Sequence, residues 1–182
     1  MESKTVGQSA VTITELMIPS YANFGGKIHG GILLSLMDKV AYAAATKHSG
    51  AYCVTVTVDN VEFLQPVEVG DLVSMMASLN FVGNSSMVVG IKVIAENVKQ
   101  GMVKHTNTSY FTMVAKDENG KPSVVPKLIL KNQEEVRRFS EAIKRRKLHK
   151  SFRERMEAEK KDFDLDCEIR ELQNQRCMID LE

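Results

Sequence analysis

One carboxylate inside an apolar stretch is the residue of this chain best suited to chemistry. Residues 31–45 are almost all apolar or small, and Asp38 interrupts them. A helix that is apolar all round is enclosed by other elements, so we expect Asp38 to be buried in protein. An ionised carboxylate is costly to bury without partners, which indicates a role beyond packing. The alternative is a structural carboxylate that a neighbouring hydroxyl such as that of Ser35 caps.

A glycine-rich loop leads into this apolar stretch. It reads Asn23-Phe24-Gly25-Gly26-Lys27-Ile28-His29-Gly30-Gly31. Glycine has no side chain in the way, so the free N–H groups of the first helical turn are open to a ligand. Gly31 and Asp38 are close to two turns apart and share one face, so they can address one elongated substrate. The alternative is a tight helix entry at which glycine is tolerated as the N-cap.

The periodicity of the chain predicts which elements position these groups. We expect a strand over Val11–Ile18, a helix over Gly30–His48, and then four strands at residues 54–63, 72–81, 87–98 and 102–116. In the last strand, alternation places His105 on the same face as Phe111. Consecutive strands with short turns build an antiparallel sheet, and only the helix is apolar enough to bury its concave face. The predicted fold class is α+β.

Composition narrows the classes of function. The chain has 182 residues, and its 24 basic and 23 acidic residues nearly balance, so the overall charge favours no nucleic-acid partner. Three cysteines fit a reducing compartment better than a disulfide framework. The four histidines are scattered without metal-ligand spacing, so we expect no metal. Neither a signal peptide nor a membrane span is predicted, which favours a cytoplasmic protein with no membrane partner.

The character of the chain changes near residue 131. We therefore divide it into a domain at 1–130 and a charged C-terminal extension at 131–182, with a helix predicted from about Asn132 to Lys161. The extension has a basic half followed by an acidic half. Its basic half can be a solvated helix face, a phosphate clamp or a nucleic-acid arm, and the lack of interleaved aromatic residues argues against the last. Pairing of the two halves between chains is a further alternative.

Several motifs in this order resemble the hotdog-fold acyl-CoA thioesterases, in particular the cytosolic acyl-CoA hydrolases and their bacterial single-domain relatives. The similarity extends from about Val11 to Leu128. The residues that carry it are Asn23, His29-Gly30-Gly31, Met37-Asp38, Phe63, Pro66, Gly70-Asp71, Gly83 and Ser86-Met87.

The resemblance implies an active site that two subunits share. In that family the Asn and the Asp form the catalytic pair, so Asn23 of one chain is expected to act with Asp38 of another. It also implies a homo-oligomer, as dimers and a trimer of such dimers, which is a hexamer. The substrate is then an acyl-CoA of lipid metabolism. Coenzyme A is part of the substrate and product, so no separate cofactor is expected.

Thioester hydrolysis assigns a role to each candidate residue. Asp38 acts as general base on water, or as nucleophile through an anhydride. The backbone N–H groups of Gly30 and Gly31 hold the oxyanion. Asn23 orients the water or the carbonyl, unless its side chain only closes an Asx-turn. His29 has no partner for a nucleophilic constellation and is interpreted as a turn or substrate-wall residue.

A second loop is a candidate for binding coenzyme A. Gly83, Ser85 and Ser86 can hold pantetheine or phosphate through hydroxyls and N–H groups, or can form an ordinary hairpin turn. Two other functions remain as alternatives. A hotdog dehydratase or hydratase would act on acyl thioesters, but the Gly-Gly after His29 differs from the proline-containing patterns of those enzymes. A non-enzymatic acyl-CoA sensor would be expected to carry a DNA-binding module, and no helix-turn-helix pattern is visible.

Overall fold

A computed structural model describes residues 2–181 of the chain. They form two compact units, of which one ends at Ala142 and the other begins at Ile143. The helices and strands are β1 Lys4–Thr5, α1 Val6–Ser9, β2 Val11–Leu16, the short 3₁₀ helix Pro19–Tyr21, α2 Gly30–Ser49, β3 Tyr52–Val58, β4 Leu72–Val82, β5 Ser86–Asn97, β6 Met102–Lys116, β7 Leu128–Ile129, α3 Gln133–Lys161 and α4 Leu165–Leu172.

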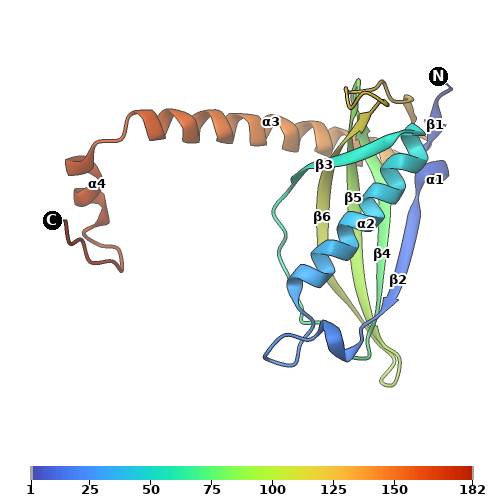
Figure 1. Ribbon diagram of the computed structural model, residues 1–182, viewed down its shortest axis with the longest axis horizontal. Helices are drawn as coiled ribbons and strands as arrows, with labels where there is room; N and C mark the ends of the chain where they lie inside the picture. The colour runs from blue at the N-terminus through green and yellow to red at the C-terminus, as the bar shows by residue number, and fades with distance from the viewer. Residues whose placement is uncertain (1, 182) are drawn as a thin grey trace. The chain divides into compact units, whose positions relative to one another are not determined.

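A five-stranded sheet forms the first unit together with α2. The strand order is β2-β4-β5-β6-β3, and all neighbouring strands are antiparallel. Figure 1 shows α2 lying across one face of this sheet. The predicted α+β fold, in which an antiparallel sheet curls around one long helix, is confirmed.

The third strand differs from the prediction in length and position. A strand up to Phe63 was expected, but β3 ends at Val58 after an irregularity between Thr55 and Thr57. The chain then follows β6 through single hydrogen bonds, such as the one from the Leu64 N–H to the Thr106 carbonyl at 2.9 Å. Moreover, β3 pairs with β6 at the sheet edge and not with β4, which follows it in sequence.

A bulge also corrects the expected face of His105. The pairing of β5 with β6 shifts between Val93 and Ile94, and Thr106 and Asn107 are both buried as a result. The extra residue shifts the alternation of inward and outward side chains by one position. His105 is therefore exposed, whereas Phe111 is in the core. A period-two pattern cannot reveal an extra residue in a strand, because the bulge depends on the partner strand.

Helix α2 packs one face on the sheet and leaves the other uncovered. Leu33, Met37 and Val40 are at most 3% exposed, whereas Leu34 and Tyr42 are 38% and 40% exposed. We expected a helix enclosed on all sides, and this prediction is wrong for the single chain. One sheet can cover only one side of a helix, so the apolar residues of the other side have no cover within the protomer.

A buried histidine joins three segments at the C-terminal end of α2. His48 is fully buried, and its Nε2 lies 3.0 Å from the Pro126 carbonyl oxygen. That oxygen can only accept, so Nε2 carries the proton and Nδ1 accepts the hydroxyl hydrogen of Ser9 at 2.8 Å. Burial is the main cause that lowers the pKa of His48 below 6.5, and the positive charge of nearby Lys4 lowers the pKa further. The hydrogen bond to Pro126 acts in the opposite direction and raises the pKa.

This histidine predicts how stability depends on pH. Below pH 6.5 the unfolded chain binds a proton at His48, whereas the folded chain keeps this side chain neutral. The free energy of unfolding is therefore highest above pH 6.5 and decreases as the pH falls toward the lowered pKa of His48. We expect the Tm to fall by a few degrees between pH 7 and pH 5, and to fall less in a His48→Gln variant. The exposed His105→Gln is the control. A scanning fluorimetry series that shows equal slopes for the three proteins would contradict this assignment.

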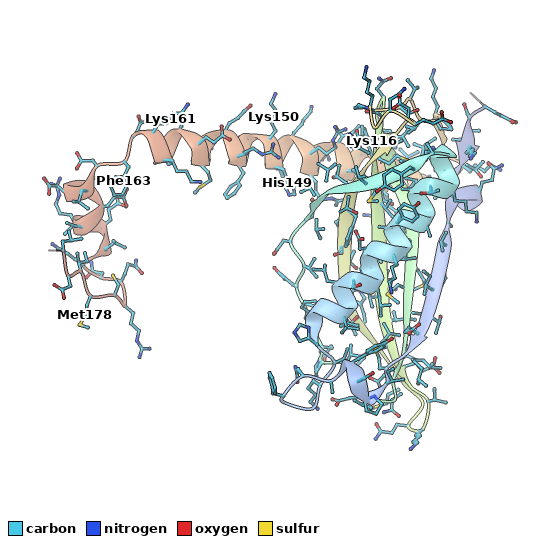
Figure 2. The ribbon with its side chains drawn as sticks, viewed as in Figure 1. Lys116, His149, Lys150, Lys161, Phe163 and Met178 are labelled. Atoms are coloured by element: carbon cyan, nitrogen blue, oxygen red, sulfur yellow. The ribbon has the colours of Figure 1, made fainter. Side chains whose placement is uncertain are left out.

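The second unit contains α3 from Ile143 onward together with α4, and it is helical and exposed. Helix α3 spans Gln133–Lys161, as predicted to within one residue, and α4 is a further short helix that was not expected. Asp164 caps α4 by accepting the N–H groups of Asp166 and Cys167. Figure 2 shows the side chains of His149, Lys150 and Lys161 projecting from α3. No helix within residues 2–181 has the length and apolar character needed to cross a bilayer.

Candidate active site

The carboxylate of Asp38 lies on the uncovered face of α2 and is held from β3. The Thr55 hydroxyl donates to Asp38 Oδ1 at 2.5 Å, and the same hydroxyl lies 3.3 Å from the Met113 sulfur. Asp38 itself is exposed, which corrects the expectation that it is buried. Its hydrogen-bond partner is Thr55 and not Ser35. The carboxylate is therefore oriented by one short hydrogen bond and is accessible to a substrate or to a second chain.

The entrance of α2 is capped by His29. Its Nδ1 accepts the Gly31 N–H at 2.8 Å, so the imidazole is the neutral form with the proton on Nε2. We expected the Gly31 N–H to be free for the oxyanion, but it donates its hydrogen bond to His29 of the same chain. The Gly30 N–H has no acceptor in the part of the chain that the structure describes.

Gly30 lies close to an aromatic ring. A Cβ atom there would lie 3.3 Å from the ring of Phe63, which comes from the segment after β3. The aromatic ring therefore lies against the Cα of Gly30 in the first turn of α2. Phe63 is itself 48% exposed, so one side of its ring faces outward.

Asn23 closes the loop ahead of these glycines. Its Oδ1 accepts the N–H groups of Gly25 at 2.9 Å and Lys27 at 3.2 Å, which is the Asx-turn of the alternative interpretation. The side chain is nevertheless exposed, and its Nδ2 has no acceptor among residues 2–181. This amide can thus donate a hydrogen bond to a ligand while its oxygen maintains the turn.

The loop that contains Gly83, Ser85 and Ser86 is a hairpin turn away from the helix entrance. The Gly83 N–H donates to the Ser86 carbonyl at 2.7 Å, and the Ser85 carbonyl accepts the Ala115 N–H at 3.0 Å. This turn lies at the end of β4, whereas Ile28, next to the entrance, bonds to Val67 just before β4 begins. Within one chain these serines and the glycine entrance are therefore separated by the length of β4.

Sequence reasoning missed the contact that orients Asp38. Thr55 belongs to an alternating Val-Thr run in which each Thr appears as an ordinary strand residue. Only the pairing of β3 with β6 and the crossing of α2 bring it to Asp38. The described residues contain no group of three or more His, Cys, Asp or Glu side chains arranged to hold a metal ion.

Comparison with known proteins identifies the family. The model of the Thioesterase superfamily matches residues 25–102. Protein VdlD of Helicobacter pylori is 45% identical over 144 residues, which cover 79% of this chain and 82% of that protein. YkhA of Bacillus subtilis, described as an uncharacterized acyl-CoA thioester hydrolase, is 35% identical over 144 residues, which cover 79% of this chain and 84% of that protein. The chain belongs to the hotdog acyl-CoA thioesterases. This family assignment confirms the resemblance that the motifs indicated.

Solved structures of hotdog acyl-CoA thioesterases superpose on most of the chain. A hexameric acyl-CoA thioesterase matches with a TM-score of 0.80 at 34% identity, over 83% of this chain and 97% of that one. The acyl-CoA hydrolase of Staphylococcus aureus, in complex with butyryl coenzyme A and coenzyme A, matches with a TM-score of 0.78 at 29% identity, over 86% and 95% of the two chains. Structures of its variants have one aspartate, one asparagine or one threonine replaced by alanine.

Proposed function

We propose that this protein hydrolyses acyl-CoA thioesters to a free fatty acid and coenzyme A. The observation that carries the proposal is the exposed Asp38 carboxylate, oriented by Thr55 on the open face of the central helix of a hotdog fold. We assign the catalytic domain to residues 1–130 and treat 131–182 as an extension to it. The cytoplasm is the proposed location, in keeping with the cytosolic mammalian hydrolases that are about 30% identical.

The spacing of three residues supports this assignment of the site. In the S. aureus hydrolase, the replaced asparagine, aspartate and threonine follow one another at intervals of 15 and 17 residues. Asn23, Asp38 and Thr55 follow one another at the same intervals. In this chain, moreover, the second and third are joined by a hydrogen bond.

Hydrolysis by this site requires a proton acceptor and a donor to the developing oxyanion. As general base, Asp38 takes a proton from water, the water oxygen bonds to the thioester carbon, and the carbon–sulfur bond breaks to release the protonated thiol. As nucleophile, it forms an anhydride as the thiolate leaves, and water then cleaves the anhydride. The Gly30 N–H is the free donor at the positive end of α2 for the oxyanion. His29 holds the turn and lines the substrate.

Completion of the site by a second chain is part of the proposal. The uncovered face of α2 carries Leu34 and Tyr42 beside Asp38, and apolar residues at such a position favour association. We propose dimers in which Asn23 of one chain faces Asp38 of the other. Three such dimers would form a hexamer, the number of subunits in the hexameric relative. The Gly83, Ser85 and Ser86 hairpin then contacts coenzyme A, and no separate cofactor takes part.

Hydrolysis assays on a series of acyl-CoAs test the function directly. Saturated substrates from acetyl-CoA to palmitoyl-CoA are incubated with the full chain, and the released thiol is measured. We expect turnover with at least one chain length. Tight binding of every acyl-CoA without release of thiol would contradict hydrolysis and favour the sensor. Hydration or dehydration of enoyl or hydroxyacyl thioesters would favour the dehydratase.

Removal of the Thr55 hydroxyl is expected to reduce activity without abolishing it. In Thr55→Val the side-chain shape is retained and the hydrogen bond to Asp38 is lost, so the carboxylate is less well oriented. A hydrogen bond to a charged group is worth about 1.5–3 kcal/mol, and we expect kcat/KM to fall about tenfold. Thr57→Val, the same change two residues along β3, is the control. Equal kinetics of the two variants would remove Thr55 from the site.

A further inference from the structure

A pocket lies on the face of the sheet opposite α2. In β4 the side chains of Val73, Met75 and Leu79 point into the core, so Ser78 and Asn80 point to the other face. The first turns of α3, which belong to the same compact unit, lie over this face behind the sheet in Figure 1. The pocket has a volume of about 580 Å³. Its lining includes Thr12, Ser78, Asn80, Lys92, Thr108, Tyr110, Arg137, Arg138 and Glu141.

Packing of α3 against the sheet holds this pocket in shape. The rings of Phe81 and Phe139 have their centroids 5.0 Å apart, and Ala142 is 1% exposed. Arg137 is in turn tied to Glu134 and Glu141 on the same helix. The pocket therefore has an ordered roof as well as an ordered floor.

The floor of the pocket holds an amide without a partner. Asn80 is the extra residue of a bulge between Leu79 and Phe81 in the pairing of β4 with β5. It is only 5% exposed, yet its side chain has no hydrogen bond within residues 2–181. The amide lies over Gly90, where a Cβ atom would be 2.3 Å from Asn80 Nδ2. Asn80 lines the pocket, so its amide is available to bond to a polar atom of a ligand there.

The charge of the lining favours an anion. Three cations line the pocket, Lys92, Arg137 and Arg138, against the single carboxylate of Glu141. The arginines are engaged with Glu134 and Glu141. Lys92 has no ion pair in the part of the chain that the structure describes. Its ammonium group is therefore the uncompensated charge of the pocket.

We propose that this pocket binds a small organic anion that carries phosphate or carboxylate groups. Lys92 neutralises the anionic group, and the Asn80 amide bonds to a polar atom of the ligand. The hydroxyls of Thr12, Ser78 and Thr108 add hydrogen-bonding groups to a lining that also contains Met76 and Ile91. The volume suits a small molecule and not a polymer. Because the sheet separates the pocket from α2, the site is distinct from that of Asp38.

Calorimetric titration of the full chain with pyrophosphate and with citrate tests this site. We expect binding of at least one anion, and the comparison between them tells phosphate from carboxylate. Lys92→Gln should weaken it about tenfold, whereas Lys99→Gln, the same charge change in the turn after β5, should not. Both variants should hydrolyse acyl-CoA at the wild-type rate, so this test is independent of the proposed function.

Asn80→Leu separates a ligand site from a structural role. Removal of a buried unpaired amide should leave the Tm unchanged or raise it, while anion binding is lost. A marked fall in Tm together with unchanged anion binding would show that Asn80 serves the fold alone and would overturn the proposal. Two other results would overturn it as well: no heat from either anion, or equal weakening by Lys92→Gln and Lys99→Gln.

Discussion

An Asp38→Asn variant is expected to hydrolyse acyl-CoA with a kcat about 100-fold lower than that of the wild type, or lower still, while it stays folded. The amide oxygen of asparagine can still accept the hydrogen bond that Thr55 donates to Asp38 Oδ1. The variant therefore keeps the shape of the site and loses only the group that takes a proton or attacks the thioester. Because Asp38 is exposed in the protomer, no buried charge is removed.

The matched control for this variant is Asp117→Asn. Asp117 accepts the N–H groups of Asn119 and Lys121 in a turn far along the chain, and its amide analogue should leave kcat unchanged. The measurements are release of the free thiol at saturating substrate and Tm by scanning fluorimetry. An Asp38→Asn protein with wild-type kcat would remove Asp38 from catalysis. A lower Tm with intact kcat would instead make it a structural carboxylate.

Mixing two inactive variants is expected to restore activity if the site is shared between chains. In a dimer of Asn23→Ala with Asp38→Ala, one site contains both wild-type residues and the other contains neither. Half of randomly paired dimers are mixed, so about a quarter of the wild-type activity should return. The structure provides the required exposure, because Asn23 has a free amide group and Asp38 lies on the uncovered face of α2.

Subunit exchange must be verified for this experiment to be decisive. Each variant carries a different affinity tag, and mixed oligomers are isolated by two successive columns before the thiol assay. Each mixed dimer should be about half as active as a wild-type dimer, since one of its two sites is complete. Oligomers that are verified to contain mixed dimers and still stay inactive would place Asn23 and Asp38 in a single chain. The Asx-turn would then be the whole role of Asn23.

Local patterns were sufficient for much of the fold. The helix over Gly30–Ser49 and the strands that begin at Val11, Leu72, Ser86 and Met102 follow from apolar periodicity and from turn residues. Each of these signals involves residues that are only a few positions apart, so the elements can be predicted without knowledge of the tertiary contacts. The glycine-rich entrance and Asp38 were recognised in the same way, because a carboxylate in an apolar run is visible without any knowledge of neighbours.

Contacts between distant segments decided the rest. The strand order places β3 beside β6, and only this pairing brings Thr55 to Asp38. His29 turned out to cap Gly31, because a side-chain cap depends on loop geometry. The bulges that expose His105 and place Asn80 over Gly90 arise between strands. By itself, the sequence determined which elements form and where the reactive carboxylate lies along the chain. Tertiary structure decided which side chains surround that carboxylate and that it stays uncovered in one protomer, since both depend on how the sheet closes on one side of the helix.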